Sequence, residues 1–372
     1  MKIQRLGQVA ALALVGSIAL AGCGSDNNTG TASSSSSSAT GSAASADCFE
    51  GTLNAEGSSA QKNAFEEAAS SFLEKCPKAT VNYNPTGSGA GIKQFIAGQV
   101  DFAGSDSALK TVEKDGVIEA DAAAKTCGSP AWNIPMVTGP IAIAYNVKGV
   151  DKLILTPAVA ADIFNGKITT WNDPAIAAIN PGVTLPATPV KVFFRSDESG
   201  TTENFTKYLN AAAPDKWTAD PAKVWSGKGE GKEKSAGVAE GVKSTDGGIT
   251  YVEWSYAKDN NLSIAQIDNG GGAVEPTSAT AATTISSATV TGTGNDLSLK
   301  LDYATTKGYP IVLVTYEITC EKGLDAALVP LTKSFLTYTS GSDAQGKLSS
   351  TGYVPITGDL LTKVQAAVAA IA

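Results

Sequence analysis

Hydrophobic and polar positions alternate along most of the chain with two different periods. Short apolar runs, typical of buried strands, occur at 49–53, 80–83, 100–103, 141–146, 190–194, 249–251 and 311–318. Between them, apolar residues three or four positions apart predict helices at 60–75, 92–97, 157–164, 174–179, 203–209, 252–257, 277–288, 323–340 and 359–370. Strands that alternate with helices in this way indicate an α/β fold.

The first 47 residues follow another pattern. Lys2 and Arg5 precede an apolar run, 9–21, which is too short to span a membrane and is typical of a signal peptide. The run ends at Cys23 in a context that resembles a bacterial lipobox, so we expect residues 1–22 to be removed and Cys23 to be acylated, for example with palmitate. The linker that follows, up to residue 47, is almost entirely small and polar, which predicts a flexible tether. These features place the folded part on the extracytoplasmic face of the cell membrane.

Composition narrows the possible functions. The chain has 372 residues, enough for two compact units of about 150 residues each beyond the tether. Its formal net charge of −8 argues against a nucleic-acid partner, and an anion would have to be held by local dipoles rather than by net charge. Histidine is absent, which excludes Ser-His and Cys-His nucleophiles and His-ligated metals. Ser-Lys, carboxylate and all-oxygen chemistry remain open on composition alone. The scattered acids show no metal-ligand spacing and there is no P-loop, so we expect no metal site, no cofactor and no enzyme activity.

Four further cysteines, Cys48, Cys76, Cys127 and Cys320, suggest two disulfides in an exported protein. Three pairings are possible. A strand followed by an antiparallel helix would bring Cys48 close to Cys76, so we favour that bond, which leaves Cys127 with Cys320.

Three glycine- or serine-rich turns, at 58–60, 86–91 and 199–201, each follow a strand and open a helix. The first backbone N–H groups of a helix are free and carry about half a positive charge, so such turns can hold an anion. The same residue types are also ordinary helix caps, and this is the expected role of Ser58. A charged, glycine-rich stretch with Lys228, Lys232 and Lys234 is interpreted as a solvated loop.

Residues 195–209 resemble the signature of the PstS-type phosphate-binding proteins, the substrate-binding subunits of the high-affinity phosphate ABC transporter. The resemblance extends over nearly all of 50–370 and includes the segments 86–94, 101–106, 168–174, 248–253 and 308–311. It implies a two-lobed α/β fold of the type II periplasmic-binding-protein class, with two crossing strands as hinge and the ligand in the interlobe cleft. Lobe one would be 48–139 plus 309–372, and lobe two would be 140–308.

The resemblance also implies roles for single residues. Ser88 matches a serine that holds a phosphate oxygen, and Asp106 matches an aspartate that accepts a hydrogen bond from the phosphate's own proton. Arg195 matches the cleft arginine and Asp197 the acid that orients it. The remaining expected phosphate ligands are Ser199, Gly200 and Thr201 in one turn and Ser59 and Ala60 in another. Relatives usually carry Thr-Phe at this last turn, so here the hydroxyl and the amide are kept but the aromatic wall is lost.

The function implied is capture of inorganic phosphate by a monomer and its delivery to the permease subunits of an ABC transporter. A binding protein for another tetrahedral oxyanion, such as sulfate or molybdate, remains an alternative. So does a surface sensor or adhesin with an inactive cleft. A phosphatase with a serine nucleophile is disfavoured, because the chain lacks histidine and any obvious metal site.

Overall fold

The computed structural model describes residues 47–114 and 116–372. The expected signal peptide at 1–22, the lipid-bearing Cys23 and all but the last residue of the expected linker lie outside the described residues. Within the described part, no helix is both long enough and apolar enough to cross a membrane.

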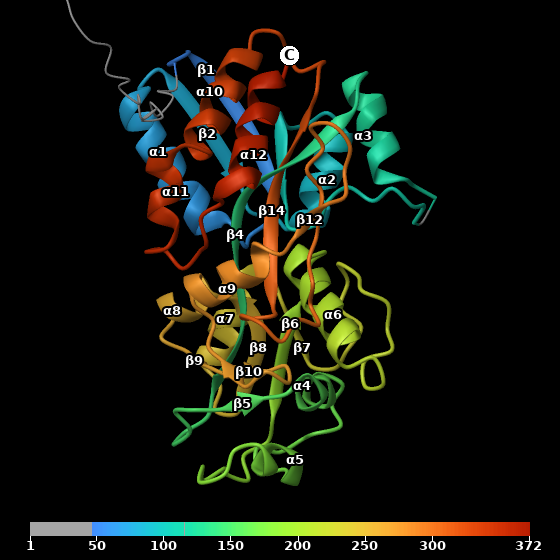
Figure 1. Ribbon diagram of the computed structural model, residues 1–372, viewed down its shortest axis with the longest axis vertical. Helices are drawn as coiled ribbons and strands as arrows, with labels where there is room; N and C mark the ends of the chain where they lie inside the picture. The colour runs from blue at the N-terminus through green and yellow to red at the C-terminus, as the bar shows by residue number, and fades with distance from the viewer. Residues whose placement is uncertain (1–46, 115) are drawn as a thin grey trace, which may run out of the picture. The chain divides into compact units, whose positions relative to one another are not determined.

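One large mixed sheet runs through the described residues (Figure 1), in the strand order β2-β1-β3-β14-β4-β8-β6-β7, with β9 added beside β4. At one end of the sheet, β1 pairs in parallel with β2 and β3. At the other end, β6 pairs in parallel with β7 and β8. The bounds of these strands are β1 Gly51–Gly57, β2 Ala79–Asn84, β3 Phe102–Ser105, β6 Lys191–Arg195, β7 Glu230–Lys232, β8 Gly248–Glu253 and β9 Ser263–Ile264.

Two central strands, β4 (Ala131–Asn146) and β14 (Val312–Cys320), connect the two ends of this sheet. Residues 131–140 of β4 pair antiparallel with β14, whereas residues 141–146 pair with β8. The chain returns beside β4, because Ile141 donates its backbone N–H to the carbonyl of Ile311 just before β14 begins. β4 and the segment leading into β14 are therefore the two crossing strands expected from the sequence.

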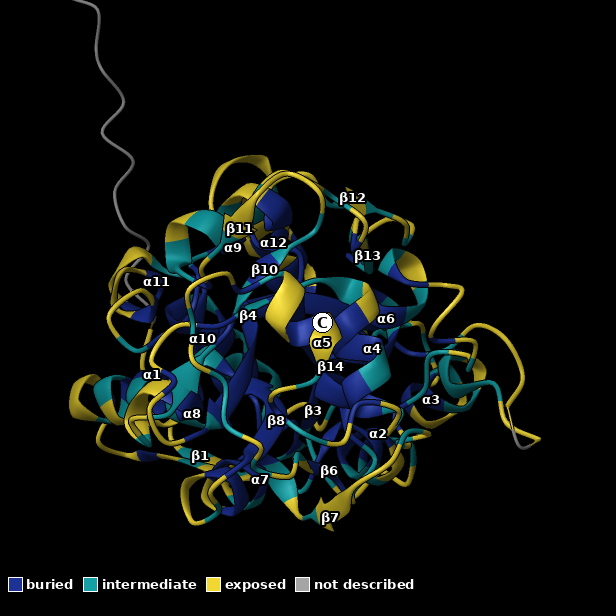
Figure 2. Ribbon diagram, turned by 90° about the horizontal axis from the view of Figure 1, so that it is seen from below, coloured by how far each residue is buried: buried dark blue, intermediate teal, exposed yellow. Residues whose placement is uncertain are grey.

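Two main hydrophobic cores flank this crossing. The first core gathers around Phe72, Phe102 and Phe335, and a satellite cluster with Ile92 and Ile318 covers the other face of the same strands. The helices beside it are α1 Lys62–Lys75, α2 Ser88–Ile96, α3 Glu119–Cys127, α10 Val329–Thr339, α11 Ser342–Leu348 and α12 Gly358–Ala370. Figure 2 shows that the buried residues concentrate on the strands and on the inner helix faces, while exposed residues lie on the outer turns.

The second core is rich in aromatic side chains. Phe205 stacks on Tyr251 with ring centroids 4.6 Å apart and meets Phe164 edge-on at 4.8 Å. Helices α4 Pro157–Phe164, α5 Pro174–Ala178 and α6 Gly200–Ala212 contribute to this core. Helices α7 Lys234–Lys243 and α8 Trp254–Asp259 pack in a smaller cluster with Ala142 and Val252, and α9 Ser278–Ile285 packs with Val312. The short strands β5 Ile154–Leu155, β10 Gln266–Asp268 and β11 Ala273–Val274 form a small sheet, and β12 Thr289–Val290 pairs with β13 Leu299–Lys300. Two cores on one α/β sheet confirm the expected fold class.

Both disulfides lie beside the first core. Cys48 is bonded to Cys76 at the end of α1, across 28 residues. Cys127 at the end of α3 is bonded to Cys320 at the end of β14, across 193 residues. This is the pairing favoured from the sequence.

Several element predictions were wrong in their bounds. The helix predicted at 323–340 begins only at Val329. Gly323 has a positive φ of 92°, which lies outside the right-handed helical region, so the helix does not begin at this residue. The strand predicted at 141–146 begins ten residues earlier. Pro135 and Pro140 argue against a central strand, but a register shift opposite Pro135 accommodates the first of them.

The stretch with Lys228, Lys232 and Lys234, interpreted from the sequence as a solvated loop, contains regular secondary structure. Residues 230–232 form β7, and Lys234 is the first residue of α7. The charged side chains of this stretch point outward, while Val238, Ala239 and Val242 form the buried face of α7. Two glycines, Gly237 and Gly241, weaken the helical signal in the sequence; a Cβ at Gly241 would lie only 3.0 Å from the Phe193 ring.

Candidate anion-binding site

Three turns that are far apart in the sequence meet between the two cores. The Gly89 backbone N–H donates to the carbonyl of Glu198 at 2.9 Å. Gly200 packs so closely that a Cβ there would lie 2.6 Å from both Ser88 Oγ and Asp106 Cβ. The structure therefore brings together the expected residues of the loops around Ser88 and Gly200, and only glycine fits at position 200.

Asp106, just after β3, is buried and surrounded by hydroxyl groups. Its carboxylate accepts hydrogen bonds from Ser58 Oγ at 2.6 Å, Thr315 Oγ1 at 2.8 Å and Ser88 Oγ at 3.2 Å. Burial raises the pKa of Asp106 to about 6; the Ser58 and Thr315 hydrogen bonds and the charge of Arg195 oppose this rise, and the negative charge of Glu253 adds to it. Asp106 is thus a strong proton acceptor with no cation bonded to it.

Arg195, at the end of β6, is the cation of the site and is 2% exposed. The Asp197 carboxylate binds one edge of the guanidinium and accepts hydrogen bonds from Nε at 2.8 Å and from Nη2 at 2.5 Å. Burial alone would raise the pKa of Asp197, but the hydrogen bonds and charge of Arg195 outweigh it and hold that pKa below its ordinary value. Asp197 therefore stays ionised and fixes Arg195 in place, which is the contact that the family resemblance implies.

The first turn of α6 lies beside Arg195. Ser199 caps this helix by accepting from the Thr202 backbone N–H at 3.2 Å. The Thr201 hydroxyl accepts from Arg195 Nη1 at 3.4 Å and donates to Glu253 Oε1 at 2.5 Å. The helix begins at Gly200, three residues earlier than predicted, so the whole expected turn is a helix N-terminus with its positive dipole end in the site. The same holds for α2, which begins at Ser88 rather than at 92.

The Ser59-Ala60 turn reaches the site from the first core. Ser59 Oγ lies 2.9 Å from Ser235 Oγ. Ala60 has no exposed surface, and its backbone N–H donates to Ser58 Oγ at 3.0 Å. Tyr256 and Tyr353 donate their hydroxyls to the carbonyls of Ser59 and Ala60. Two tyrosine hydroxyls thus hold the backbone of this turn in place.

Sequence reasoning missed three side chains of this site: Ser235, Glu253 and Thr315. Ser58 was expected to cap a helix, but the N-cap of α1 is Gln61, and Ser58 Oγ donates to Asp106 instead. Glu253 lies in a segment that matched the family, but its buried carboxylate was not singled out. Thr315 lies in a strand that also carries Tyr316, Glu317 and Thr319, so its hydroxyl did not stand out in the sequence. Ser235 lies at the apolar spacing of Val238, Ala239 and Val242, one turn before them, and could have been found from that spacing.

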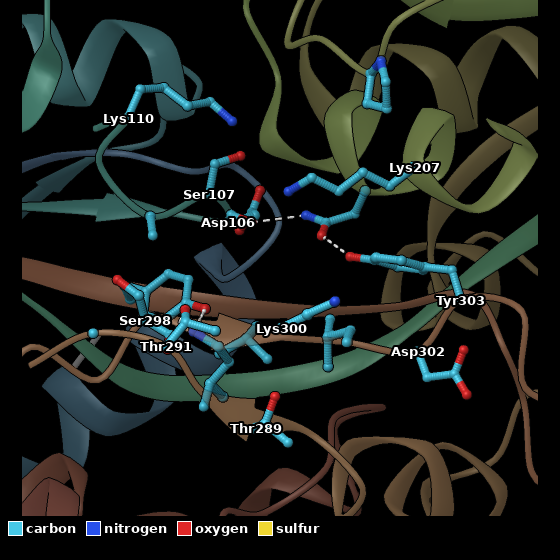
Figure 3. Close-up of a pocket in the computed structure, with 18 of the residues that line it drawn as sticks. Asp106, Ser107, Lys110, Lys207, Thr289, Thr291, Ser298, Lys300, Asp302 and Tyr303 are labelled. Carbon is cyan, nitrogen blue, oxygen red and sulfur yellow. Dashed lines mark hydrogen bonds between the residues drawn. The ribbon is translucent and has the colours of Figure 1, made fainter. Parts of the chain in front are cut away.

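A cavity of about 1100 Å³ opens beside Asp106, between α6 and the β12–β13 hairpin (Figure 3). Lys110 and Lys207 reach into it from the two sides and both bond to the buried carboxylate of Glu203, at 2.5 and 2.7 Å. Burial opposes ionisation of Glu203, but the charges of Lys207 and Lys110 outweigh it and lower its pKa to about 2. The Lys110–Glu203 pair connects the segment after β3 to α6, whereas Lys207 pairs with Glu203 within α6.

The described residues contain no group of three or more Cys, Asp or Glu side chains placed to hold a metal ion. The polar groups of the site are hydroxyls, backbone amides, one guanidinium and carboxylates. This donor set suits a small oxyanion that still carries a proton.

A family model and several relatives of known name match this chain over most of its length. The family model described as PBP superfamily domain matches residues 29–343. Phosphate-binding protein PstS 3 of Mycobacterium tuberculosis is 43% identical over 380 residues, covering 100% of both chains. Phosphate-binding protein PstS of Xylella fastidiosa is 32% identical over 295 residues, covering 77% of this chain and 76% of the relative.

Solved structures show the same fold at lower identity. A high-affinity periplasmic phosphate-binding protein (PfluDING) bound with phosphate superposes with a TM-score of 0.67 at 22% identity, covering 85% of this chain and 93% of its own. The phosphate-binding protein from Stenotrophomonas maltophilia gives a TM-score of 0.65 at 20% identity, with the same two coverages. The fold is that of the two-lobed periplasmic binding proteins, and the chain belongs to the PBP superfamily and, within it, to the family of PstS phosphate-binding proteins.

Proposed function

We propose that this chain captures inorganic phosphate outside the cytoplasmic membrane and delivers it to the permease subunits of an ABC transporter. The observation that carries the proposal is the pairing of a buried proton acceptor, Asp106, with a buried, pre-oriented arginine, Arg195, in one hydroxyl-lined site. Full-length relatives named phosphate-binding protein PstS support the choice of ligand.

The mechanism of binding follows from the donors present. The guanidinium of Arg195, with one edge held by Asp197, presents its remaining N–H groups to phosphate oxygens. The helix starts at Ser88 and Gly200 add backbone N–H groups, each worth about 0.3–2 kcal/mol depending on burial. Ser59, Ser88, Ser199 and Thr201 supply hydroxyls, and Ala60 supplies a backbone amide.

Selectivity would come from Asp106. Phosphate near neutral pH carries at least one proton and can donate it to this carboxylate, whereas sulfate carries none. Sulfate would place an oxygen lone pair against a buried carboxylate, a mismatch that can give about 10⁴-fold discrimination.

The lobes proposed are 48–139 plus 309–372 and 140–308, closing around the ion by a hinge at the crossing strands. The interlobe contacts Lys110–Glu203 and Ser59–Ser235 support closure between these units. Residues 289–300 are assigned to lobe two by chain order, although Asp296 accepts hydrogen bonds from Asn133 of lobe one.

PstS-type proteins act outside the cytoplasm as substrate-binding subunits of transporters and not as enzymes. For this chain we extend that role to a monomer without catalytic activity, anchored to the membrane by a lipid on Cys23. A hydrophobic n-terminal run followed by a small, polar linker supports the anchor.

The proposal is tested by titrating phosphate-stripped protein with phosphate, arsenate and sulfate in a calorimeter. We expect phosphate to bind far more tightly than sulfate, and Asp106→Asn to shrink that difference by about 10- to 100-fold, since the amide no longer rejects sulfate. Asp121→Asn, an exposed acid on α3, is the matched control and should leave both affinities unchanged.

Other outcomes would overturn the proposal. Equal affinity for phosphate and sulfate would remove Asp106 as the selectivity residue, and tighter binding of sulfate or molybdate would assign the site to another oxyanion. No binding of any of these ions would leave a sensor or an adhesin as the better description.

A further inference from the structure

Ser235 occupies a core-facing position of α7, although the charged residues before it suggest a surface loop. The buried positions Val238, Ala239 and Val242 lie three, four and seven residues after it, on the same helix face. Its side chain has no exposed surface. A serine at the end of an apolar stripe needs polar partners, because a buried hydroxyl without them is costly.

The partners of Ser235 are residues that the family resemblance assigns to the anion. Its Oγ lies 2.9 Å from Ser59 Oγ, and its backbone N–H donates to that same oxygen at 3.2 Å. It also accepts from Arg195 Nη1 at 3.2 Å. Ser235 thus touches the hydroxyl of one expected phosphate ligand and the cation of another, from an element that contributes no other expected ligand.

The two edges of the Arg195 guanidinium differ in the quality of their hydrogen bonds. The bonds to Asp197, at 2.5 and 2.8 Å, are short and charge-assisted. The two bonds made by Nη1, to Thr201 at 3.4 Å and to Ser235 at 3.2 Å, are long. The Nη1 edge therefore retains bonding capacity for a closer oxygen, and Ser235 stands at this edge.

The backbone before Ser235 is held in an unusual conformation. Lys234 has a φ of 63°, in the left-handed region that a residue with a side chain seldom adopts. Its backbone N–H donates to Asp197 Oδ1 at 2.9 Å, so the acid that orients Arg195 also fixes the start of α7. Such conformations persist where surrounding contacts enforce them, often at functional sites.

We propose that the hydroxyl of Ser235 contacts phosphate directly, as a further binding residue outside the matched motifs. This inference rests on the proposed function. When phosphate oxygens take the Nη1 edge of Arg195, the Ser235 hydroxyl no longer accepts from the arginine and donates to the same ion. Lobe two thereby adds a hydroxyl opposite Ser59, beside the turn that lacks the aromatic residue.

The test is phosphate titration of four stripped proteins: wild type, Ser235→Ala, Ser59→Ala and the double variant. Alanine is the stronger helix former, so the substitution does not itself weaken α7. Loss of a hydrogen bond to a charged ligand should reduce affinity about 10- to 100-fold. The decisive result is that Ser235→Ala weakens binding in the Ser59→Ala background too, because a direct contact does not depend on the Ser59 partner.

Ser244→Ala is the matched control, since Ser244 caps the other end of α7 and bonds only to that helix; its affinity should equal that of wild type. A loss seen only when Ser59 is present would overturn the inference, because Ser235 would then act solely as a latch between the lobes. Unchanged affinity of Ser235→Ala, with or without a lower melting temperature, would overturn it too. If wild type binds no phosphate, the proposed function fails and this inference with it; a failure confined to Ser235→Ala leaves the proposed function intact.

Discussion

The two halves of the site shift the pKa values of their buried carboxylates in opposite directions. Asp106, beside the first core, meets only hydroxyls, and burial raises its pKa to about 6. Asp197, beside the second core, is also largely buried, but Arg195 outweighs burial and lowers its pKa. The hydrogen-bonding partner of each carboxylate therefore decides the direction of its pKa shift. Asp106 can accept a proton from the ligand, and Asp197 holds the positive charge of Arg195 in place.

The largest expected effect comes from removing the cation. Arg195→Met keeps the apolar stem but leaves Asp197 and Glu253 buried without their counter-charge. Breaking a buried ion pair from one side typically costs about 3–5 kcal/mol, so we expect the free energy of unfolding in urea to fall by that amount. Phosphate affinity should fall by at least about 10³-fold, because a bidentate charged contact is lost.

The control for this variant is Arg195→Met combined with Asp197→Asn, which removes both charges of the pair. The double variant should regain part of the lost stability but none of the affinity. If Arg195→Met alone were as stable as wild type, the second half of the site would not depend on its ion pair, and the contrast with Asp106 would disappear.

The second prediction compares how the stability contributed by Asp106 and by Asp197 changes with pH. The folded-state pKa of Asp106 is about 6 against an ordinary value of 3.8, so between these values the folded, ligand-free protein keeps a proton that the unfolded chain has lost. Stability must then fall as pH rises through this window, by about 3 kcal/mol for a shift of roughly two units. The measurement is the difference between the urea stability curves of wild type and Asp106→Asn from pH 4 to 7.

The difference between the urea stability curves of wild type and Asp197→Asn should have the opposite slope with pH. The folded-state pKa of Asp197 is lowered, so its stabilisation is present above its ordinary pKa and is lost as pH falls through the folded value. Burial raises the pKa of Glu317, another buried acid, to about 8, and the charge of Asp106 adds to this rise; Glu317 therefore cancels in the Asp197 difference but not fully in the Asp106 difference. Two difference curves with the same sign of slope would contradict the comparison.

Much of this site was predictable because its residues lie in short, contiguous motifs. The serine, glycine and threonine of 199–201 follow an arginine and an acid within seven residues, and the turn chemistry of a helix start is local. Asp106 follows its strand directly. Where these residues are neighbours in the chain, the sequence predicted groups that the structure brings together, without any knowledge of how the strands pair; that they bind phosphate stays a prediction.

The residues that were missed depend on contacts across long stretches of chain. Ser235 meets Ser59 over a separation of 176 residues, and Thr315 meets Asp106 over 209. No local pattern specifies such pairs. The first half of β4 was missed for a different reason: Pro135, Gly139 and Pro140 are poor strand residues, and only pairing with β14 on one side and burial make that conformation the stable one.

The smallest expected effect concerns a surface contact between the halves. Lys93 of α2 pairs with Glu198 at 2.7 Å, but their side chains are 69% and 40% exposed. Exposed pairs typically contribute about 0.2–1 kcal/mol, and salt screens them. A double-mutant cycle with Lys93→Met and Glu198→Gln should therefore change phosphate affinity by no more than about fivefold, less in high salt.

Lys75→Met with Asp343→Asn, an exposed pair within the first half, should not change affinity at all. An effect of Lys93→Met as large as that of Arg195→Met would mean that closure, rather than the buried charges, determines how tightly the ion is held.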